Sequence, residues 1–500
     1  AGWTQSSDFP TTPGAFDRAI GGITHLDAFV LRLNPSGSDL EYSTLLGNDG
    51  SDEALALALA PSGAAVVVGL TDLPVAGALP DFPATPGAYQ NAAATGAIAT
   101  AFLARLSPNG DALEWSTFLG RLSIATAVTL DSSENVFVAG TGGPPPHFPV
   151  TPGALLSVPP FASDRDIFVA RMSSDGSTLG WGGVFGGWLQ DDATGIALDA
   201  RGDVYVCGYT QSNDFPTTPD AFQTTMAPPI FRDAWVARID SSGSAFVYCT
   251  YIGHVGDDQA HGISVDPSGV ATTGGLSLSF MATTPGAFRR INVNGEGFIA
   301  RLTPDGRRSI YTTFVGGPGN DTGWALAANA SGRVVLAGVT NGLGFPTTPG
   351  SAQPNYAGGQ FDATVSVLEL HPRGVEPLGV STPSCLGPLQ LQVSRMPEVG
   401  AVRFSLLCSA APPNTVGWLL ISSAAAQPAV IRSGATLYID PTALSHKLPV
   451  TSDSAGFVEV QLPALQTAVG ARYYAQYLFA GNCGAASGWT ASNALEITVQ

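Results

Sequence analysis

The feature that most constrains this chain is a string of eight residues that returns at a nearly constant interval. Phe-Pro-Thr-Thr-Pro-Gly-Ala-Phe fills positions 9–16, and variants of it fill 82–89, 148–155, 215–222, 281–288 and 345–352. Measured on the second proline, from Pro13 to Pro349, the successive spacings are 73, 66, 67, 66 and 64 residues. A period of this length indicates one supersecondary unit that is stacked on copies of itself.

Between the copies, four short segments recur in a fixed order, each rich in Val, Ala, Leu and aromatic residues. In one repeat they are 195–199, 204–210, 233–239 and 246–252. Tight turns join the first strand to the second, as at 266–269, and the third to the fourth, as at 34–37, with Pro fixing φ and Gly supplying a positive φ. Four antiparallel strands per repeat are typical of a propeller blade. Residues 1–379 are therefore predicted to form a β-propeller of six blades, with seven possible.

The repeat also resembles a known family. Asp-Ala-Phe-Val-x-Arg-Leu at 27–33, Tyr-Ser-Thr-x-Leu-Gly at 42–47 and Gly-x-Thr-x-x-x-Asp-Phe-Pro-Thr-Thr-Pro-Gly at 2–14 resemble the bacterial β-propeller repeat called SBBP, over residues 1 to about 374. This resemblance implies a module of a larger secreted or surface protein, hence an extracellular or cell-surface location. It implies no particular chemistry.

A different pattern follows from residue 380. About seven short strands are expected, at 389–393, 402–407, 416–421, 436–439, 457–461, 473–479 and 495–499. This number of strands with turn signals between them predicts a C-terminal β-sandwich at 380–500 and makes the whole chain all-β. Segments 411–415, 453–456 and 492–499 resemble C-terminal modules of secreted planctomycete-like bacterial proteins.

Charge and hydropathy exclude two classes of partner. The 21 basic residues stand against 39 acidic ones, the net charge is −18, and the single lysine is Lys447. Nucleic acid is not expected as a partner, because phosphate binding needs clustered Lys and Arg. No apolar run reaches the roughly 20 residues that a membrane-spanning helix needs, so membrane insertion is not expected either.

Acidic loops lead from the fourth strand of one repeat to the first strand of the next, at 48–53, 190–192, 256–258 and 319–321, and the copy at 121–124 breaks the series. Such loops close turns and accept backbone amides, or they hold Ca²⁺, which takes six to eight oxygen ligands. The first interpretation is favoured, and no other cofactor is expected. If Ca²⁺ binds, the expected ligands are Asp49, Asp52, Asp191, Asp192, Asp257, Asp258 and Asp321.

Arginines also recur, on the third strand of five repeats. An anion-binding ring is one interpretation, but a repeated strand position is fixed by the fold, so we expect each guanidinium to pack on a neighbouring strand and pair with an acidic side chain. The tryptophans are likewise expected to pack between blades rather than to form a sugar-stacking platform. The arginines are Arg32, Arg105, Arg171, Arg238 and Arg301.

The five cysteines fit no metal-binding spacing. Cys207 and Cys249 fall on the second and fourth strands of one repeat, about 9.6 Å apart, so they are expected to stay reduced and buried. A hairpin turning at 397–400 would bring Cys385 opposite Cys408, which favours that disulfide over one between Cys385 and Cys483.

No HExxH motif and no Gly-x-Ser-x-Gly elbow is present. The favoured hypothesis is a non-enzymatic extracellular or cell-surface binding or structural module, with the propeller as a rigid platform and the sandwich as an attachment or assembly domain. A protein or glycan partner is expected at the face that carries the long Thr-Pro-Gly connections, which are roughly 20 residues long. The alternatives are a secreted polysaccharide hydrolase or lyase, and a self-assembling subunit of an extracellular filament.

The two ends of the repeat array are expected to be incomplete. Residues 1–4 align with the end of a second strand, so the first blade lacks its first strand. We expect the chain to extend upstream, or another chain to supply the strand, because an unpaired edge is avoided. At the other end, 375–380 is the candidate fourth strand of the last blade.

Overall fold

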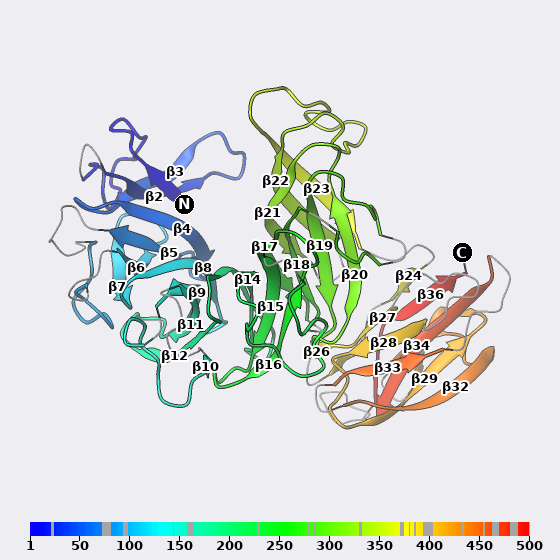
Figure 1. The fold of residues 1–500 in the computed structure, drawn as a ribbon. Helices are drawn as coiled ribbons and strands as arrows, with labels where there is room; N and C mark the ends of the chain where they lie inside the picture. Colours follow the sequence, from blue (N-terminus) through cyan, green and yellow to red (C-terminus); the bar gives the residue numbers. More distant parts are fainter. Residues whose placement is uncertain are drawn as a thin grey trace. The chain divides into compact units, whose positions relative to one another are not determined.

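A computed structural model describes residues 1–499 except 22–24, 73–81, 94–98, 144, 158–164, 228–230, 268, 279, 285–286, 330–332, 371–374, 380, 385–386, 394–403, 433–434, 454–455, 463–469 and 481–488. The described residues form strands, turns and loops and no helix (Figure 1). They divide into two compact units. The first comprises 1–198, 202–218 and 225–251, and the second comprises 199–201, 219–224 and 252–500.

The first unit contains four antiparallel sheets whose main strands follow the chain order. The first has three strands and the others have four, with a short outer strand, β10, added in parallel to β12. The strands are β1 (Gly2–Thr4), β2 (Asp27–Leu33) and β3 (Leu40–Leu46); β4 (Asp52–Leu59), β5 (Ala65–Asp72), β6 (Ala99–Leu106) and β7 (Leu113–Leu119); β8 (Ser123–Leu130), β9 (Val136–Gly142), β10 (Leu156–Ser157), β11 (Asp166–Met172) and β12 (Leu179–Phe185); β13 (Asp191–Leu198), β14 (Val204–Thr210), β15 (Asp233–Ile239) and β16 (Phe246–Ile252).

The second unit continues with one four-stranded and one three-stranded sheet of the same kind, followed by the sheets of the C-terminal region. The repeat strands are β17 (Asp258–Val265), β18 (Ala271–Ser277), β19 (Glu296–Leu302) and β20 (Ser309–Val315); β21 (Asp321–Ala328), β22 (Arg333–Thr340) and β23 (Asp362–Glu369).

The C-terminal region has a six-stranded sheet in the order β24, β36, β34, β29, β32, with β35 also paired to β34, and a three-stranded sheet in the order β27, β28, β33. Leu391, Leu406, Leu419, Tyr477 and Ile497, from both sheets, share one buried core. The strands are β24 (Val375–Leu378), β25 (Pro383–Ser384), β26 (Gly387–Pro388), β27 (Gln390–Val393), β28 (Ser405–Ser409), β29 (Val416–Ser422), β30 (Ala425–Arg432), β31 (Ala435–Ile439), β32 (Leu444–Thr451), β33 (Val458–Gln461), β34 (Arg472–Ala480), β35 (Trp489–Ala491) and β36 (Ala494–Thr498).

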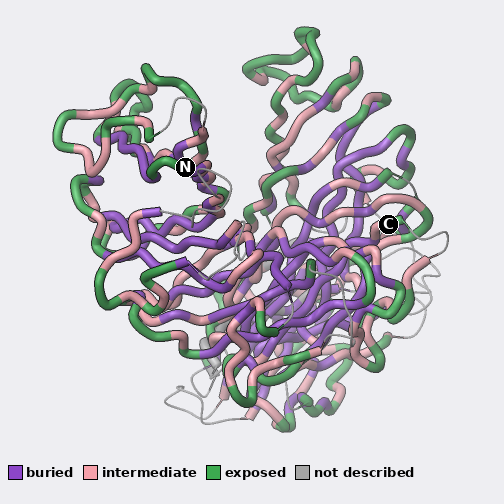
Figure 2. Tube along the Cα trace, turned by 60° about the vertical axis from the view of Figure 1, so that its left-hand side comes forward, coloured by how far each residue is buried: buried purple, intermediate pink, exposed green. Residues whose placement is uncertain are grey.

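Neighbouring repeat sheets are held together by apolar residues on their facing sides. Val66 on β5, Val138 on β9 and Phe168 on β11 belong to one buried cluster, which also contains Trp115 and Val184. Both faces of a middle sheet are therefore covered, and the strands are mostly buried while exposed residues gather in the connections (Figure 2). Strands buried on both faces read as near-continuous apolar runs, as these do.

The Thr-Pro-Gly loops lie along the outer edge of the fourth strand. In five repeats a threonine of the loop donates its backbone N–H to the carbonyl of one residue of that strand and accepts the N–H of the same residue on its hydroxyl. The N···O distances of the first contact are 3.0 Å for Thr12–Ser43, Thr85–Ser116, Thr151–Gly182 and Thr218–Cys249, and 3.1 Å for Thr284–Thr312. Each loop thus uses the hydrogen-bonding groups of an otherwise unpaired sheet edge.

The same loops also reach the following repeat. The N–H of Phe16 donates to the carbonyl of Gly110 at 2.9 Å, and that of Leu155 donates to Gly243 at 2.7 Å. Gly110 and Gly243 lie in the turns between the third and fourth strands of the next sheet. The long connections are therefore packed along the sheets rather than projecting freely from them.

The prediction for 375–380 was wrong. β24 pairs with β36, with Val375 opposite Ile497, so this segment belongs to the C-terminal sheet and not to the last repeat. Val375 is buried in the C-terminal core, and removing its apolar side chain from water stabilises this pairing. The missing first strand of the first repeat is confirmed, because β1, β2 and β3 make up that sheet in the described residues.

The cysteines give one confirmation and one correction. Cys207 on β14 and Cys249 on β16 are buried thiols with β15 between their strands, as predicted. Cys408 is also a buried thiol, and the register sets Leu391 opposite it, so the argument that places Cys385 opposite Cys408 was wrong. Cys385 and Cys483 lie outside the described residues, and their pairing stays a prediction.

Candidate functional site

The acidic loops position one aspartate at the start of the first strand of a repeat, where its carboxylate closes the loop. Oδ2 of each such aspartate accepts a backbone N–H from the residue four positions earlier. The N···O distances are 3.0 Å from Asn48 to Asp52, 2.6 Å from Gly187 to Asp191, 2.9 Å from His254 to Asp258 and 2.6 Å from Gly317 to Asp321. All four carboxylates are buried, so each fixes the loop that precedes its strand.

The other three predicted calcium ligands have separate surroundings. Asp49 is exposed, and Asp257 accepts a hydrogen bond from Gln259 Nε2 at 2.9 Å. Asp192 accepts one from Thr141 Oγ1 at 2.9 Å and pairs with Arg165 at 2.8 Å. Within the part of the chain that the structure describes, no three metal-ligating side chains come together. Calcium binding by these loops stays a prediction.

Burial of the loop carboxylates changes their acidity. Desolvation raises the pKa of Asp191 to about 7, against the opposing hydrogen bonds from Thr210, Gly187 and Ser212. Desolvation likewise raises the pKa of Asp258 to about 7. A carboxylate in such surroundings is costly to ionise, and the hydrogen bonds that it accepts from hydroxyl and backbone N–H groups favour the charged form.

The recurring arginines pair with acidic side chains, as predicted. Arg238 is almost fully buried, lies over the ring of Tyr205 at 5.3 Å and binds Asp203 with Nη2 at 2.7 Å. The remaining pairs are Arg32–Glu41 at 2.6 Å, Arg105–Glu114 at 2.7 Å, Arg105–Glu134 at 2.5 Å, Arg171–Asp131 at 4.0 Å and Arg301–Asp266 at 3.3 Å. Arg171, Arg238 and Arg301 thus hold the third strand to a turn of the same repeat, whereas Arg105 also reaches Glu134 in a turn of the next repeat.

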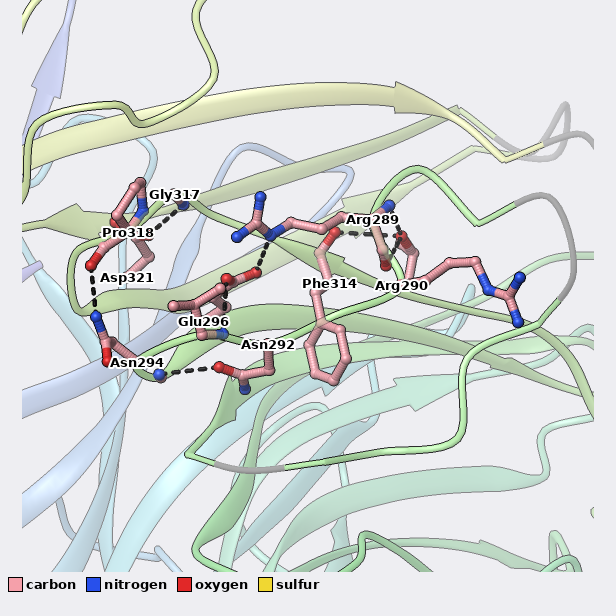
Figure 3. A network of polar contacts seen from close by, with 12 residues as sticks. Arg289, Arg290, Asn292, Asn294, Glu296, Phe314, Gly317, Pro318 and Asp321 are labelled. Carbon is pink, nitrogen blue, oxygen red and sulfur yellow. Dashed lines mark hydrogen bonds and ion pairs between the residues drawn. The ribbon is translucent and has the colours of Figure 1, made fainter.

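A further buried acid begins the third strand of the fifth repeat (Figure 3). Glu296 accepts a hydrogen bond from Arg289 Nε at 2.6 Å and from the backbone of Val293 at 3.2 Å. Asn294 Nδ2 donates to the carbonyl of Pro318 at 2.8 Å and so ties this loop to the acidic loop that Asp321 closes. The network links two connections that lie at the same end of the strands.

One position of the repeat is chemically variable. In the first strand of five repeats the ladder skips one residue, which is a β-bulge, and the bulged residue is flanked on both sides by Ala or Gly. A bulge changes the direction in which a side chain points, and bulges are common beside binding sites. The bulged residues are Leu55, Thr126, Thr194, His261 and Trp324.

His261 and Trp324 lie on β17 and β21, the first strands of two neighbouring sheets of the second unit, and stack on each other. Their ring centroids are 4.6 Å apart and the rings are 5° from parallel. His261 Nδ1 lies 2.8 Å from the carbonyl of Gly323, which only accepts, so Nδ1 is the protonated nitrogen. Burial lowers the pKa of His261, which favours the neutral ring. Trp324 is 58% exposed.

A groove of about 490 Å³ lies between the β19–β20 turn and strands β32 and β33. Arg308 pairs with Glu459 there, and Arg307 lies 3.9 Å from Asp305 and 3.7 Å from Asp220. The corresponding turns of the first four repeats, at 34–39, 107–112, 173–178 and 240–245, carry no basic residue. Its lining of mixed charge has no dominant sign.

Residues 183–216 match the family model described as SBBP, beta-propeller repeat. The match supports a β-propeller repeat protein. No curated protein matches the chain in sequence.

Several solved structures are similar at low identity. They include quinohemoprotein alcohol dehydrogenase from Comamonas testosteroni (9% identity, 64% of this chain and 53% of that chain, TM-score 0.32), Pyrococcus horikoshii acylaminoacyl peptidase (8%, 85% and 58%, 0.28) and polysaccharide lyase Uly1 (8%, 99% and 94%, 0.29). The chain spans little more than half the length of the first two proteins. Among the described residues, no helix has the length and hydropathy to cross a membrane.

The expected acids and arginines lie where the repeat predicts, but the sequence reasoning missed the bulged position. A usable signal exists: the fourth residue of each first strand changes between Leu, Thr, His and Trp while its two neighbours stay Ala or Gly. Such a contrast marks a position that the fold leaves open.

Proposed function

We propose that the chain is a non-enzymatic binding or structural module that acts outside the cell or at the cell surface of a bacterium. In this proposal the repeats form a six-bladed β-propeller that serves as a rigid platform. The C-terminal region is a β-sandwich that attaches the platform or assembles it with other domains.

One observation carries the proposal: the charged side chains that recur in the repeats hold strands, turns and loops of the same protein. Asp191 and Asp321 close loops, and Arg238 is buried against Asp203. General acid–base chemistry needs titratable groups that face a substrate, whereas these groups face the backbone and one another. A repeated scaffold with its charges used internally supports binding rather than turnover.

Incubation with insoluble and soluble polysaccharides tests the proposal. We expect the chain to co-sediment with an insoluble polysaccharide or to shift in an affinity gel. We expect neither reducing ends, which a hydrolase releases, nor the absorbance at about 235 nm that an unsaturated lyase product gives. Release of either product, abolished by a point substitution in the chain, would instead establish the hydrolase or lyase alternative. Labelling of intact cells by an antibody against the chain tests the location.

A further inference from the structure

The sheet of the sixth repeat ends one strand early. Its order is β21, β22, β23, and within the described part of the chain no fourth strand lies beyond β23. The segment that follows, β24, pairs with β36 of the C-terminal sheet instead. In each of the five preceding repeats a fourth strand fills this place, as β20 does beside β19. One edge of β23 therefore carries the backbone groups that hold a strand in the other repeats.

The fifth repeat shows which backbone groups of β23 lie on this open edge. There Thr312 on β20 turns both its N–H and its carbonyl outward to the covering loop. Its neighbour Thr313 therefore turns its own inward, opposite Ile299 of β19. Val365 corresponds to Ile299, because each lies three positions after the acid that begins its strand. The backbone groups of Val365 thus point away from β22, as do those of the residues two positions to either side.

The Thr-Pro-Gly loop of the sixth repeat is folded like its counterparts. The carbonyl of Thr348 accepts the N–H of Ser351 at 3.1 Å, and that of Thr284 accepts the N–H of Ala287 at 3.1 Å in the fifth repeat. Thr284 also holds the outer edge of β20 through its N–H and its hydroxyl. Among the described residues no strand carbonyl accepts the N–H of Thr348, and this threonine is exposed. The cover is formed, but no described strand lies beneath it.

The side chains of β23 indicate what kind of strand fits. The other five repeats have an arginine at the position of Val367, and in four of them the register sets it opposite an aromatic residue of the fourth strand, as Arg301 is opposite Tyr311. An aromatic side chain opposite a β-branched one is also a stabilising cross-strand pair, so Val367 suits the same aromatic residue. Thr348 in turn needs a residue whose N–H and carbonyl face outward, as those of Thr312 do.

From this arrangement we propose that the open edge of β23 accepts a β-strand of another polypeptide, which completes the sheet and lies beneath the loop of Thr348. The strand carries the pattern of the repeat's own fourth strands: an aromatic residue, two small residues and two apolar ones. The inference rests on the proposed binding function and names a protein partner for it. A second copy of the chain fits less well, because its own β23 gives its other edge to β22 and leaves no carbonyl for Thr348.

A synthetic peptide of residues 306–317, which spans β20, is the probe, and a scrambled peptide of the same composition is its control. Fluorescence polarisation of each labelled peptide with the full chain should show saturable binding of the first peptide alone. N-methylation of the peptide at Thr313 removes an N–H that must face β23, so it should abolish binding. Amide hydrogen exchange of the bound chain should slow at Val365.

Two substitutions with matched controls locate the peptide. Val365→Pro removes an N–H from the open edge but none from the pairing with β22, and it should weaken binding by about tenfold or more, whereas Val365→Thr keeps this N–H and should bind like wild type. Thr348→Val removes the hydroxyl of the covering loop and should weaken binding by about fivefold. Thr284→Val makes the same change in a loop whose strand is present, so it should leave the affinity for the peptide unchanged. Thermal unfolding curves separate lost binding from lost fold.

The outcomes distinguish this inference from the proposed function. Equal binding of the two peptides, no binding at millimolar concentration, or equal affinity of wild type, Val365→Pro and Thr348→Val would each overturn the open edge and leave the binding module standing. A dimer of the chain that Val365→Pro dissociates would assign the edge to a second copy and overturn the proposed partner. Release of sugar products from a polysaccharide would overturn the non-enzymatic function instead.

Discussion

Replacing Gly243 by alanine should expose how tightly successive repeats are packed. Gly243 lies in the turn between β15 and β16 with φ of +72°, and a Cβ there would lie 2.3 Å from Cδ2 of Trp181 on the preceding sheet. Trp181 is buried and contacts Phe137, with ring centroids 6.3 Å apart, so the indole has little room to move away. The left-handed backbone costs about 1–2 kcal/mol for alanine, and overpacking adds about 1–3 kcal/mol.

Gly37 provides the matched control, because it occupies the same turn of the first repeat. Its φ is +70°, yet no atom lies within 4 Å of a Cβ built there. Gly37→Ala should therefore cost about 1–2 kcal/mol and Gly243→Ala about 2–5 kcal/mol. Urea unfolding followed by tryptophan fluorescence and by circular dichroism measures both differences. Equal destabilisation by the two substitutions would refute the argument that the indole limits this turn.

Three further predictions concern charged groups. Arg238→Met should destabilise the chain by about 3–5 kcal/mol, because it removes the buried guanidinium that pairs with Asp203. Arg32→Met removes only an exposed pair with Glu41 and should cost no more than about 1 kcal/mol. Similar free energies of unfolding for the two variants in urea would contradict this prediction. Burial raises the pKa of Asp191 to about 7 from 3.8, so the folded state binds the proton of this carboxyl more tightly than the unfolded state. The free energy of unfolding of wild type relative to Asp191→Asn should therefore fall as the pH rises from about 4 to about 7. A difference in stability that does not change with pH would refute this. If the acidic loops bind calcium, millimolar CaCl₂ should raise the Tm of the chain, and Asp257→Asn should reduce that rise. An unchanged Tm would contradict calcium binding and leave the hydrogen bonds to backbone amides as the only role of these aspartates.

Much of the repeat architecture was predictable because its signals are local. The Pro and Gly of each tight turn and the apolar runs between them mark the strands, and the period assigns them to sheets. The roles of Arg238 and Cys249 followed from strand position alone. Where the array ends, this reasoning failed: Val375 is apolar enough for either neighbouring core, and only the partner strand β36, far away in sequence, decides between them.

The candidate site was less predictable for a related reason. The segment around Trp324 is typical of an ordinary apolar strand, so its residues predict neither the β-bulge nor the exposure of this side chain. The stack with His261 forms between strands about 60 residues apart, so no spacing in the sequence announces it. These residues differ from the corresponding residues of the other repeats, so a comparison of equivalent positions along the sequence can identify them.

The threonines that cover the outer strands have a consequence for how such a chain can grow. Each of five repeats carries its own cover for its outer edge, as Thr85 does at Ser116, and the same loop can reach forward to the next repeat, as Tyr89 does at Gly176. A duplicated segment of one period would therefore bring with it both its protection against strand-to-strand aggregation and its joint to the neighbour that follows. Duplication or deletion of one period can then lengthen or shorten the array while every remaining outer strand keeps its cover.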